Sequence, residues 1–129
     1  MRILIKDDTI GGETENSFTI EIGAEYVTVD ELIKARIYEE VNRYNEKLPE
    51  YFRSLVQPTN TEITLNGYKR LDNKKLDAEK QYYLALEAFQ QNVFFLLVND
   101  KQVDSLTEKI RMKDNMELNF IKLTPLVGG

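Results

Sequence analysis

The fold is decided by the stretch Phe18–Ile37, FTIEIGAEYVTVDELIKARI, in which a two-residue period gives way to a helical one. From Phe18 to Ile22 every second residue is apolar, which predicts a half-buried strand. A helix is expected to begin at Thr28, because Thr28 can cap a free backbone N–H while Glu31 reaches back, the capping-box arrangement. The helix residues expected to face a sheet recur at helical spacing and are Ile33, Ile37, Val41 and Tyr44.

A first strand precedes this stretch and should pair with it as a hairpin. The odd-numbered residues from Met1 to Ile5 are apolar, as on the buried side of a strand. The connection from Asp7 to Asn16 contains a glycine pair and many polar residues, which predicts the hairpin loop. The Asp7-Asp8 pair is therefore expected to be solvated loop charge.

The middle of the chain is expected to carry an inserted region from about Lys47 to Asn92. Pro49 should end or interrupt the first helix, since a proline disfavours helix at the residue before it. Asn66-Gly67 predicts a two-residue hairpin turn. A second helix is expected from Asp77 to Gln91, with Asp77 as its cap. Its apolar stripe, which we interpret as core, consists of Ala78, Tyr82, Ala85, Leu86 and Phe89.

The last third of the chain returns to strands. The run Val93–Val98 is apolar without alternation, the pattern of a central strand covered on both faces. Asn99-Asp100 can turn the chain, and Val103 can start the returning strand. A closing strand is expected from Glu117 to Leu123, after a turn at Asp114-Asn115 whose asparagine can take a left-handed conformation. The irregular segment between these strands should be anchored by Leu106, Ile110 and Met112.

Composition limits the chemistry of this 129-residue chain. It contains no cysteine and no histidine, which excludes disulfides, zinc sites built on Cys or His, and Cys-His or Ser-His-Asp catalysis. A carboxylate pair or a Mg²⁺ site of Asp and Glu stays open, but no acidic cluster has ligand spacing. We therefore expect no enzyme, no metal site and no bound cofactor.

Charge and hydropathy also limit the partners. The net charge of −5 argues against a nucleic-acid partner, because nucleic-acid binders normally carry a basic stripe. The longest apolar run is far too short to cross a bilayer, so no membrane association is expected. Nothing at the N-terminus reads as a signal peptide, and a cytoplasmic location is the expectation.

The final residues Thr124–Gly129, TPLVGG, follow the expected closing strand directly and end in a diglycine. Together with Val98–Val103 and Met112–Leu118, this tail resembles the ubiquitin-like β-grasp superfamily with a C-terminal diglycine. The resemblance is strongest to bacterial sulfur carriers, such as the small subunit of molybdopterin synthase and the thiamine sulfur carrier. Pro125 and the diglycine match the end of that pattern, and the inserted region has no counterpart in the minimal carriers. The tail residues that depart from the pattern are Thr124, Leu126 and Val127.

The resemblance implies an α+β fold of the β-grasp (ubiquitin-like) type, a mixed sheet packed on a helix. The region at about 47–92 would be an inserted hairpin and helix. One domain would span residues 1–123, followed by an extended tail at residues 124–129.

The resemblance also implies a function for the tail. As in a bacterial ubiquitin-like modifier, the Gly129 carboxylate would be adenylated by an activating enzyme that uses ATP, then passed to a thiol and to a target amine. A conjugating enzyme and a peptidase would be further partners. Alternatively, Gly129 would become the thiocarboxylate of a sulfur carrier, with a sulfurtransferase and a cofactor synthase as partners. A third possibility is a non-covalent β-grasp interaction module.

The physical properties of the tail fit such a use. Gly128 and Gly129 lack a Cβ atom, so the tail can thread a narrow channel and let its carbonyl approach partner atoms closely. Six extended residues reach about 20 Å, enough to enter the active site of a neighbour. An apolar docking patch is also expected on the sheet, near Val103 and Leu123. The tail residues expected to be recognised by a partner are Pro125, Leu126 and Val127.

Overall fold

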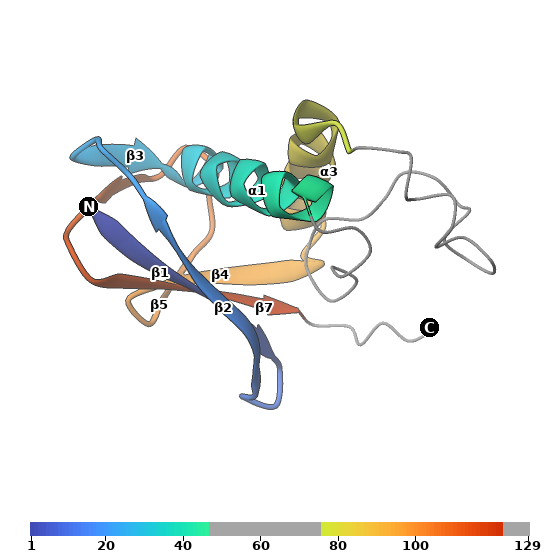
Figure 1. The fold of residues 1–129 in the computed structure, drawn as a ribbon. Coiled ribbons are helices and arrows are strands. Elements are labelled where there is room, and N and C mark those ends of the chain that lie inside the picture. Colours follow the sequence, from blue (N-terminus) through green and yellow to red (C-terminus); the bar gives the residue numbers. More distant parts are fainter. Residues whose placement is uncertain (47–75, 123–129) are drawn as a thin grey trace.

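A sheet and two helices form two layers in the computed structural model, which describes residues 1–46 and 76–122 (Figure 1). Both helices lie on the same side of the sheet. In chain order the elements are β1 (Arg2–Thr9), β2 (Thr14–Glu21), β3 (Tyr26–Thr28), α1 (Val29–Glu46), α3 (Ala78–Gln90), β4 (Phe94–Val98), β5 (Lys101–Val103), β6 (Lys109–Arg111) and β7 (Met116–Lys122).

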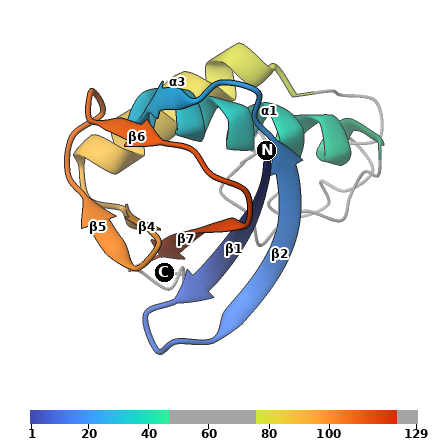
Figure 2. The ribbon, with the colours of Figure 1, turned by 90° about the vertical axis from the view of Figure 1, so that its left-hand side faces the viewer.

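The central pair of the five-stranded sheet runs parallel. The strand order is β2-β1-β7-β4-β5; β1 and β7 are parallel, and the other neighbours are antiparallel. β3 and β6 form a separate two-stranded ladder (Figure 2). The fold is therefore of the mixed α+β class, and the first and last strands described lie side by side at the centre of the sheet.

The core lies between the helices and the sheet face that they cover. On β1, Ile3 and Ile5 are fully buried. The inner face predicted for the first helix is confirmed, because Ile33, Ile37, Val41 and Tyr44 are all buried. The stripe predicted for the second helix also packs on the core, with Ala85 and Phe89 buried and Ala78, Tyr82 and Leu86 partly buried.

The beginnings of both helices are capped. The Thr28 backbone N–H donates to Glu31 Oε1 at 2.8 Å, which confirms that Glu31 reaches back. The Thr28 hydroxyl instead donates to the Asp30 carboxylate. The first free N–H groups of α1 donate to carbonyls of the segment before β6, with Asp30 N–H 3.0 Å from the Leu106 oxygen. Asp77 caps α3 as predicted, accepting from the Glu79 N–H at 3.0 Å.

The first hairpin is longer than predicted and its loop is shorter. β1 continues to Thr9 and β2 begins at Thr14, so Asp7 and Asp8 are strand residues and the prediction of loop charge was wrong. Asp7 is in phase with Ile3 and Ile5 and is 1% exposed, because its carboxylate is paired with an arginine of α1.

The prediction for Val93–Val98 was also wrong in one respect, because this strand is covered on one face only. In β4, Phe94 is buried, whereas Phe95 and Leu97 are half-buried and Val93, before the strand, is 45% exposed. Burial alternates along β4, but apolar and polar residues do not alternate in its sequence, because apolar side chains also occupy the outer face.

The turns of the last third lie where the sequence placed them. Asn99 and Asp100 both have positive φ, and β5 begins directly after them at Lys101, so Val103 ends the returning strand rather than starting it. Asn115 has a φ of 67°, which confirms the left-handed turn before β7. The predicted anchors Leu106, Ile110 and Met112 are buried or partly buried. The segment is not irregular throughout, because Ile110 lies in β6 and pairs with β3.

Several predictions fall outside the described residues. These are the helix end at Pro49, the turn at Asn66-Gly67, the last residue of the closing strand, Leu123, and the tail at 124–129. Neither α1 nor α3, the two helices in the described ranges, combines the length and the apolar character needed to cross a bilayer.

Candidate functional site

The carboxyl ends of β1 and β7 meet at one end of the sheet. Because the two strands are parallel, Asp7 lies beside Phe120 and Thr9 lies beside Lys122. In sequence, the chain continues from Lys122 toward the diglycine. This end of the sheet is therefore the described part of the molecule that bears most directly on the tail.

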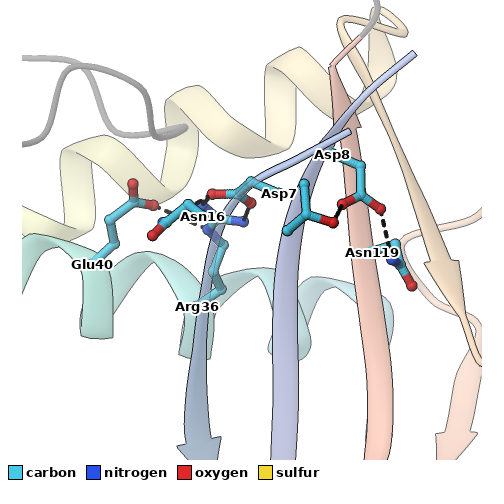
Figure 3. Close-up of polar contacts among 7 residues, drawn as sticks. Asp7, Asp8, Asn16, Arg36, Glu40 and Asn119 are labelled. Atoms are coloured by element: carbon cyan, nitrogen blue, oxygen red, sulfur yellow. Dashed lines mark hydrogen bonds and ion pairs between the residues drawn. The ribbon is translucent and has the colours of Figure 1, made fainter. Parts of the chain in front are cut away.

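A buried ionic cluster of Asp7, Arg36 and Glu40 joins α1 to this end of the sheet (Figure 3). The Arg36 guanidinium donates to both Asp7 oxygens, with Nη2 2.7 Å from Oδ2, and its Nε donates to Glu40 Oε1 at 3.0 Å. The exposed fractions are 0%, 1% and 3% for Arg36, Asp7 and Glu40. Asp7 Oδ2 also accepts from the Asn16 amide at 3.3 Å, so a polar side chain of β2 joins the cluster.

Two aromatic rings face the Arg36 guanidinium. Its Cζ lies 4.5 Å from the centre of the Phe120 ring and 5.5 Å from that of Phe18. Cation–π attraction of this kind is stronger in a desolvated site than on a surface. The guanidinium therefore connects α1 to three strands at once: β1 through Asp7, β7 through Phe120 and β2 through Phe18.

The cluster keeps its arginine charged. Burial by itself lowers the pKa of Arg36, but the charges of Glu40 and Asp7 and their hydrogen bonds outweigh burial, so its pKa stays above the usual value.

A second group of hydrogen-bonded polar side chains lies on the opposite face of the sheet, at the same ends of the strands. Successive residues of a strand point to opposite faces, so Asp8 lies on the face that the helices leave open. Asp8 accepts from the Thr14 hydroxyl at 2.8 Å and from Asn119 Nδ2 at 2.7 Å (Figure 3). Asn119 is 8% exposed, and its Oδ1 has no hydrogen-bond partner within the described residues.

Lys122 ends β7 beside this cluster. Burial is the largest influence on its ammonium group and lowers its pKa; Asp7 opposes that effect and Arg36 adds to it. The last described residue before the tail is thus held in the electrostatic field of the buried cluster.

The residues predicted to act or be recognised in the tail, Pro125, Leu126, Val127, Gly128 and Gly129, lie outside the described residues. The docking patch predicted near Val103 is wrong for that residue, because Val103 is 4% exposed and faces the core. The outer face of the sheet instead carries half-buried apolar side chains of other strand residues, namely Leu4, Phe95, Leu97 and Ile121.

The ionic cluster was missed at the sequence level, although two signals point to it. Asp7 continues the alternation of Ile3 and Ile5, and a strand residue in that phase faces the core. Arg36 and Glu40 are four residues apart and adjoin the buried helix stripe, so they are placed to interact on one helix face.

No family model matches the chain, and searches of curated proteins and of solved structures return no match. In residues 1–46 and 76–122, no group of three or more carboxylates is arranged to hold a metal ion.

Proposed function

We propose that this chain is a ubiquitin-like protein of the β-grasp type, in which the Gly129 carboxyl group is activated for transfer. Peptidase trimming would supply that carboxyl group if the natural chain continues further. One observation carries the proposal: β7 is paired on both sides, with β1 and with β4, so the chain leaves the sheet from its centre. A segment that starts from a strand held on both sides has a fixed origin, which suits delivery of its end to an enzyme.

The order of elements supports the same proposal. A strand hairpin, a helix across the sheet and a final strand parallel to the first are the parts expected of a mixed sheet grasping a helix. The ionic cluster adds rigidity where it is needed, because Arg36 fixes α1 to the strand end that precedes the tail.

The proposed chemistry begins with an unreactive group. A terminal carboxylate has a pKa of about 3.3–3.7 and is anionic at neutral pH, so it is a poor acyl donor. Attack of its oxygen on the α-phosphorus of ATP releases pyrophosphate and leaves an acyl adenylate. A thiolate then displaces AMP to give a thioester, and an amine displaces the thiolate to give an amide. The chain has no cysteine, so the thiol belongs to a partner.

The partners proposed for the modifier are an activating enzyme, a conjugating enzyme and a peptidase, and its proposed location is the cytoplasm. A sulfur carrier is the second candidate, favoured by a tail without basic residues, TPLVGG, which resembles that group. In that case hydrosulfide displaces AMP and leaves a thiocarboxylate, which a cofactor synthase would use. The activation step is common to both.

Intact mass spectrometry tests the activation step. The chain ending at Gly129 is incubated with ATP and an adenylating enzyme from the same organism, then with a sulfur source or with cell lysate. Exchange of one oxygen for sulfur identifies a carrier, and a link from Gly129 to a lysine identifies a modifier. An unchanged mass, with an enzyme that is active on its own substrate, refutes both.

A pair of glycine variants makes the test specific. Gly129→Ala should abolish most of the product without changing the thermal midpoint, because a Cβ at the reacting residue obstructs a narrow channel. Gly23→Ala is the matched control, since a Cβ at Gly23 would meet no atom within 4 Å. Full activation of Gly129→Ala would contradict the role given to Gly129.

A further inference from the structure

The sheet has an open edge along β2. This strand is the outermost one on its side of the sheet, and among the described residues only β1 pairs with it (Figure 2). Its regular part runs from Asn16 to Glu21, because the register of the β1–β2 pair shifts at the hairpin end, between Asp7 and Asp8 of β1. An uncovered edge of this kind presents unpaired backbone groups to a second chain.

The backbone groups that point outward from β2 belong to exposed residues. Met1 and Ile22 exchange backbone hydrogen bonds, with the Ile22 N–H donating to the Met1 oxygen at 2.9 Å and the Met1 nitrogen donating to the Ile22 oxygen at 2.7 Å. In an antiparallel pair such hydrogen-bonded positions alternate with positions that are not hydrogen-bonded. The even-numbered residues of β2 therefore bond to β1, and the N–H and C=O groups that point away from the sheet are those of Ser17, Thr19 and Glu21. All three residues are exposed.

Charge decides which register two antiparallel copies of β2 can adopt. With Thr19 on the two-fold axis, the two Thr19 residues lie opposite each other and Ser17 lies opposite Glu21 of the other copy. Moving the axis by one residue toward the hairpin would place Glu15 opposite Glu21, and like charges directly opposite are destabilising. Moving it by one residue the other way would leave only residues 19–21 of each β2 paired, because the strand ends at Glu21.

The register centred on Thr19 is self-complementary on both faces of the sheet. On the outer face, the Ser17 hydroxyl is placed to donate to the Glu21 carboxylate of the other copy, and the two threonines form a Thr–Thr pair, which is favourable across strands. On the helix face, Phe18 lies opposite Ile20 of the other copy, and these side chains are already buried in the single chain, at 8% and 6% exposed. The contact therefore relies mainly on backbone hydrogen bonds, so a weak dimer is expected.

We propose that β2 of one copy pairs antiparallel with β2 of a second copy, with Thr19 on the two-fold axis, so that the two sheets become continuous. Each hydrogen-bonded pair, Thr19 with Thr19 and Ser17 with Glu21, exchanges two backbone hydrogen bonds. A two-fold contact of this kind uses the same patch on both copies and closes after two copies. This inference goes beyond the tail chemistry, because β2 lies at the margin of the sheet and β7 lies at its centre.

Sedimentation equilibrium and NMR of the full chain test the dimer. The average mass should rise toward that of two chains between about 10 µM and about 1 mM protein, as for a dissociation constant on the order of 0.1 mM. Over the same range the amide signals of Ser17 and Thr19 should shift, whereas that of Gln102, in β5 at the other edge, should not. In a mixture of two isotopically distinct copies, an intermolecular contact between the α protons of Phe18 and Ile20 should appear, because these residues form the pair that is not hydrogen-bonded.

Two charge variants of Thr19 supply the decisive test. Thr19→Lys or Thr19→Glu alone should weaken the dimer by about fivefold or more, because two like charges then meet at the axis. Mixing the two variants should restore a dimer, since opposite charges then face each other. Gln102→Lys, at an exposed position of the other edge strand, is the control and should dimerise like the wild type.

The outcomes separate cleanly because Thr19 is exposed, so both variants should keep the thermal midpoint of the wild type. A wild-type chain that stays monomeric at about 1 mM overturns the proposal. A dimer that both Thr19 variants form as well as the wild type overturns it too, because the contact would then lie elsewhere on the molecule.

Discussion

Replacing Arg36 by methionine removes the guanidinium and leaves Asp7 and Glu40 buried without it. Three hydrogen bonds are lost, two to Asp7 and one to Glu40, together with the contact to the Phe120 ring. Removing one partner of a buried ion pair typically costs 3–5 kcal/mol, because a buried charge is left uncompensated, so we expect a loss of about 4 kcal/mol at pH 7. The measurement is urea unfolding followed by circular dichroism, with the m value checked for two-state behaviour.

Arg43→Met is the matched control on the same helix. Arg43 pairs with Glu39 at 2.9 Å, but both side chains are 37% exposed, so solvent screens the pair. Its guanidinium also lies 4.6 Å from the centre of the Phe18 ring. Such exposed contacts contribute about 1 kcal/mol or less, and Arg43→Met should lose no more than that.

A triple variant separates uncompensated charge from lost packing. Asp7→Leu, Arg36→Met and Glu40→Leu together leave no unpaired charge, and such apolar replacements of buried ion clusters are often neutral or stabilising. The triple variant should recover most of the stability that Arg36→Met loses. An Arg36→Met variant within about 1 kcal/mol of the wild type, or a triple variant less stable than the single one, would refute the reasoning.

Substitutions at three further positions test a helix cap, a left-handed turn and a partly buried lysine. Asp77→Ala removes the acceptor of the Glu79 N–H and should lower the free energy of unfolding by about 1 kcal/mol in urea titrations, whereas Asp77→Ser should retain most of it. Asn115, at a φ of 67°, should tolerate glycine but lose about 1 kcal/mol on replacement by alanine, measured by thermal unfolding. Lys122 has a folded pKa below its ordinary 10.5, so the unfolded chain binds more protons between the folded value and 10.5. Stability of the wild type should therefore rise with pH through that window relative to Lys122→Met, and a flat difference would count against the burial of this ammonium group.

Local signals predicted most of the elements well. The alternation from Phe18 to Ile22 and the spacing from Ile33 to Tyr44 report burial directly, because one face of each element must reach the core. Asp77 was identifiable as a cap from its position before an apolar stripe. These features depend on residues that are near one another in the sequence, so hydrophobic periodicity and helix-capping residues are enough to predict them.

Features set by contacts between distant segments were harder to predict. Asp7 was interpreted as loop charge because it begins the polar connection that contains the glycine pair, and the arginine that permits its burial lies 29 residues away. The outer face of β4 could not be assigned either, since Phe95 and Leu97 are as apolar as the buried residues between them. The length of β5 could not be predicted, because no local pattern fixes its end at Val103.

The position of β7 also has a consequence for biosynthesis. β1 and β4 are its two neighbours, so neither has its partner on that side until residue 122 has left the ribosome. A nascent chain cannot close its sheet before then, and a fragment that stops earlier exposes two strand edges, which are sites of aggregation. Completion of the sheet thus waits for β7, the last strand described, and we expect the folded, protease-resistant core to form only after translation has passed it.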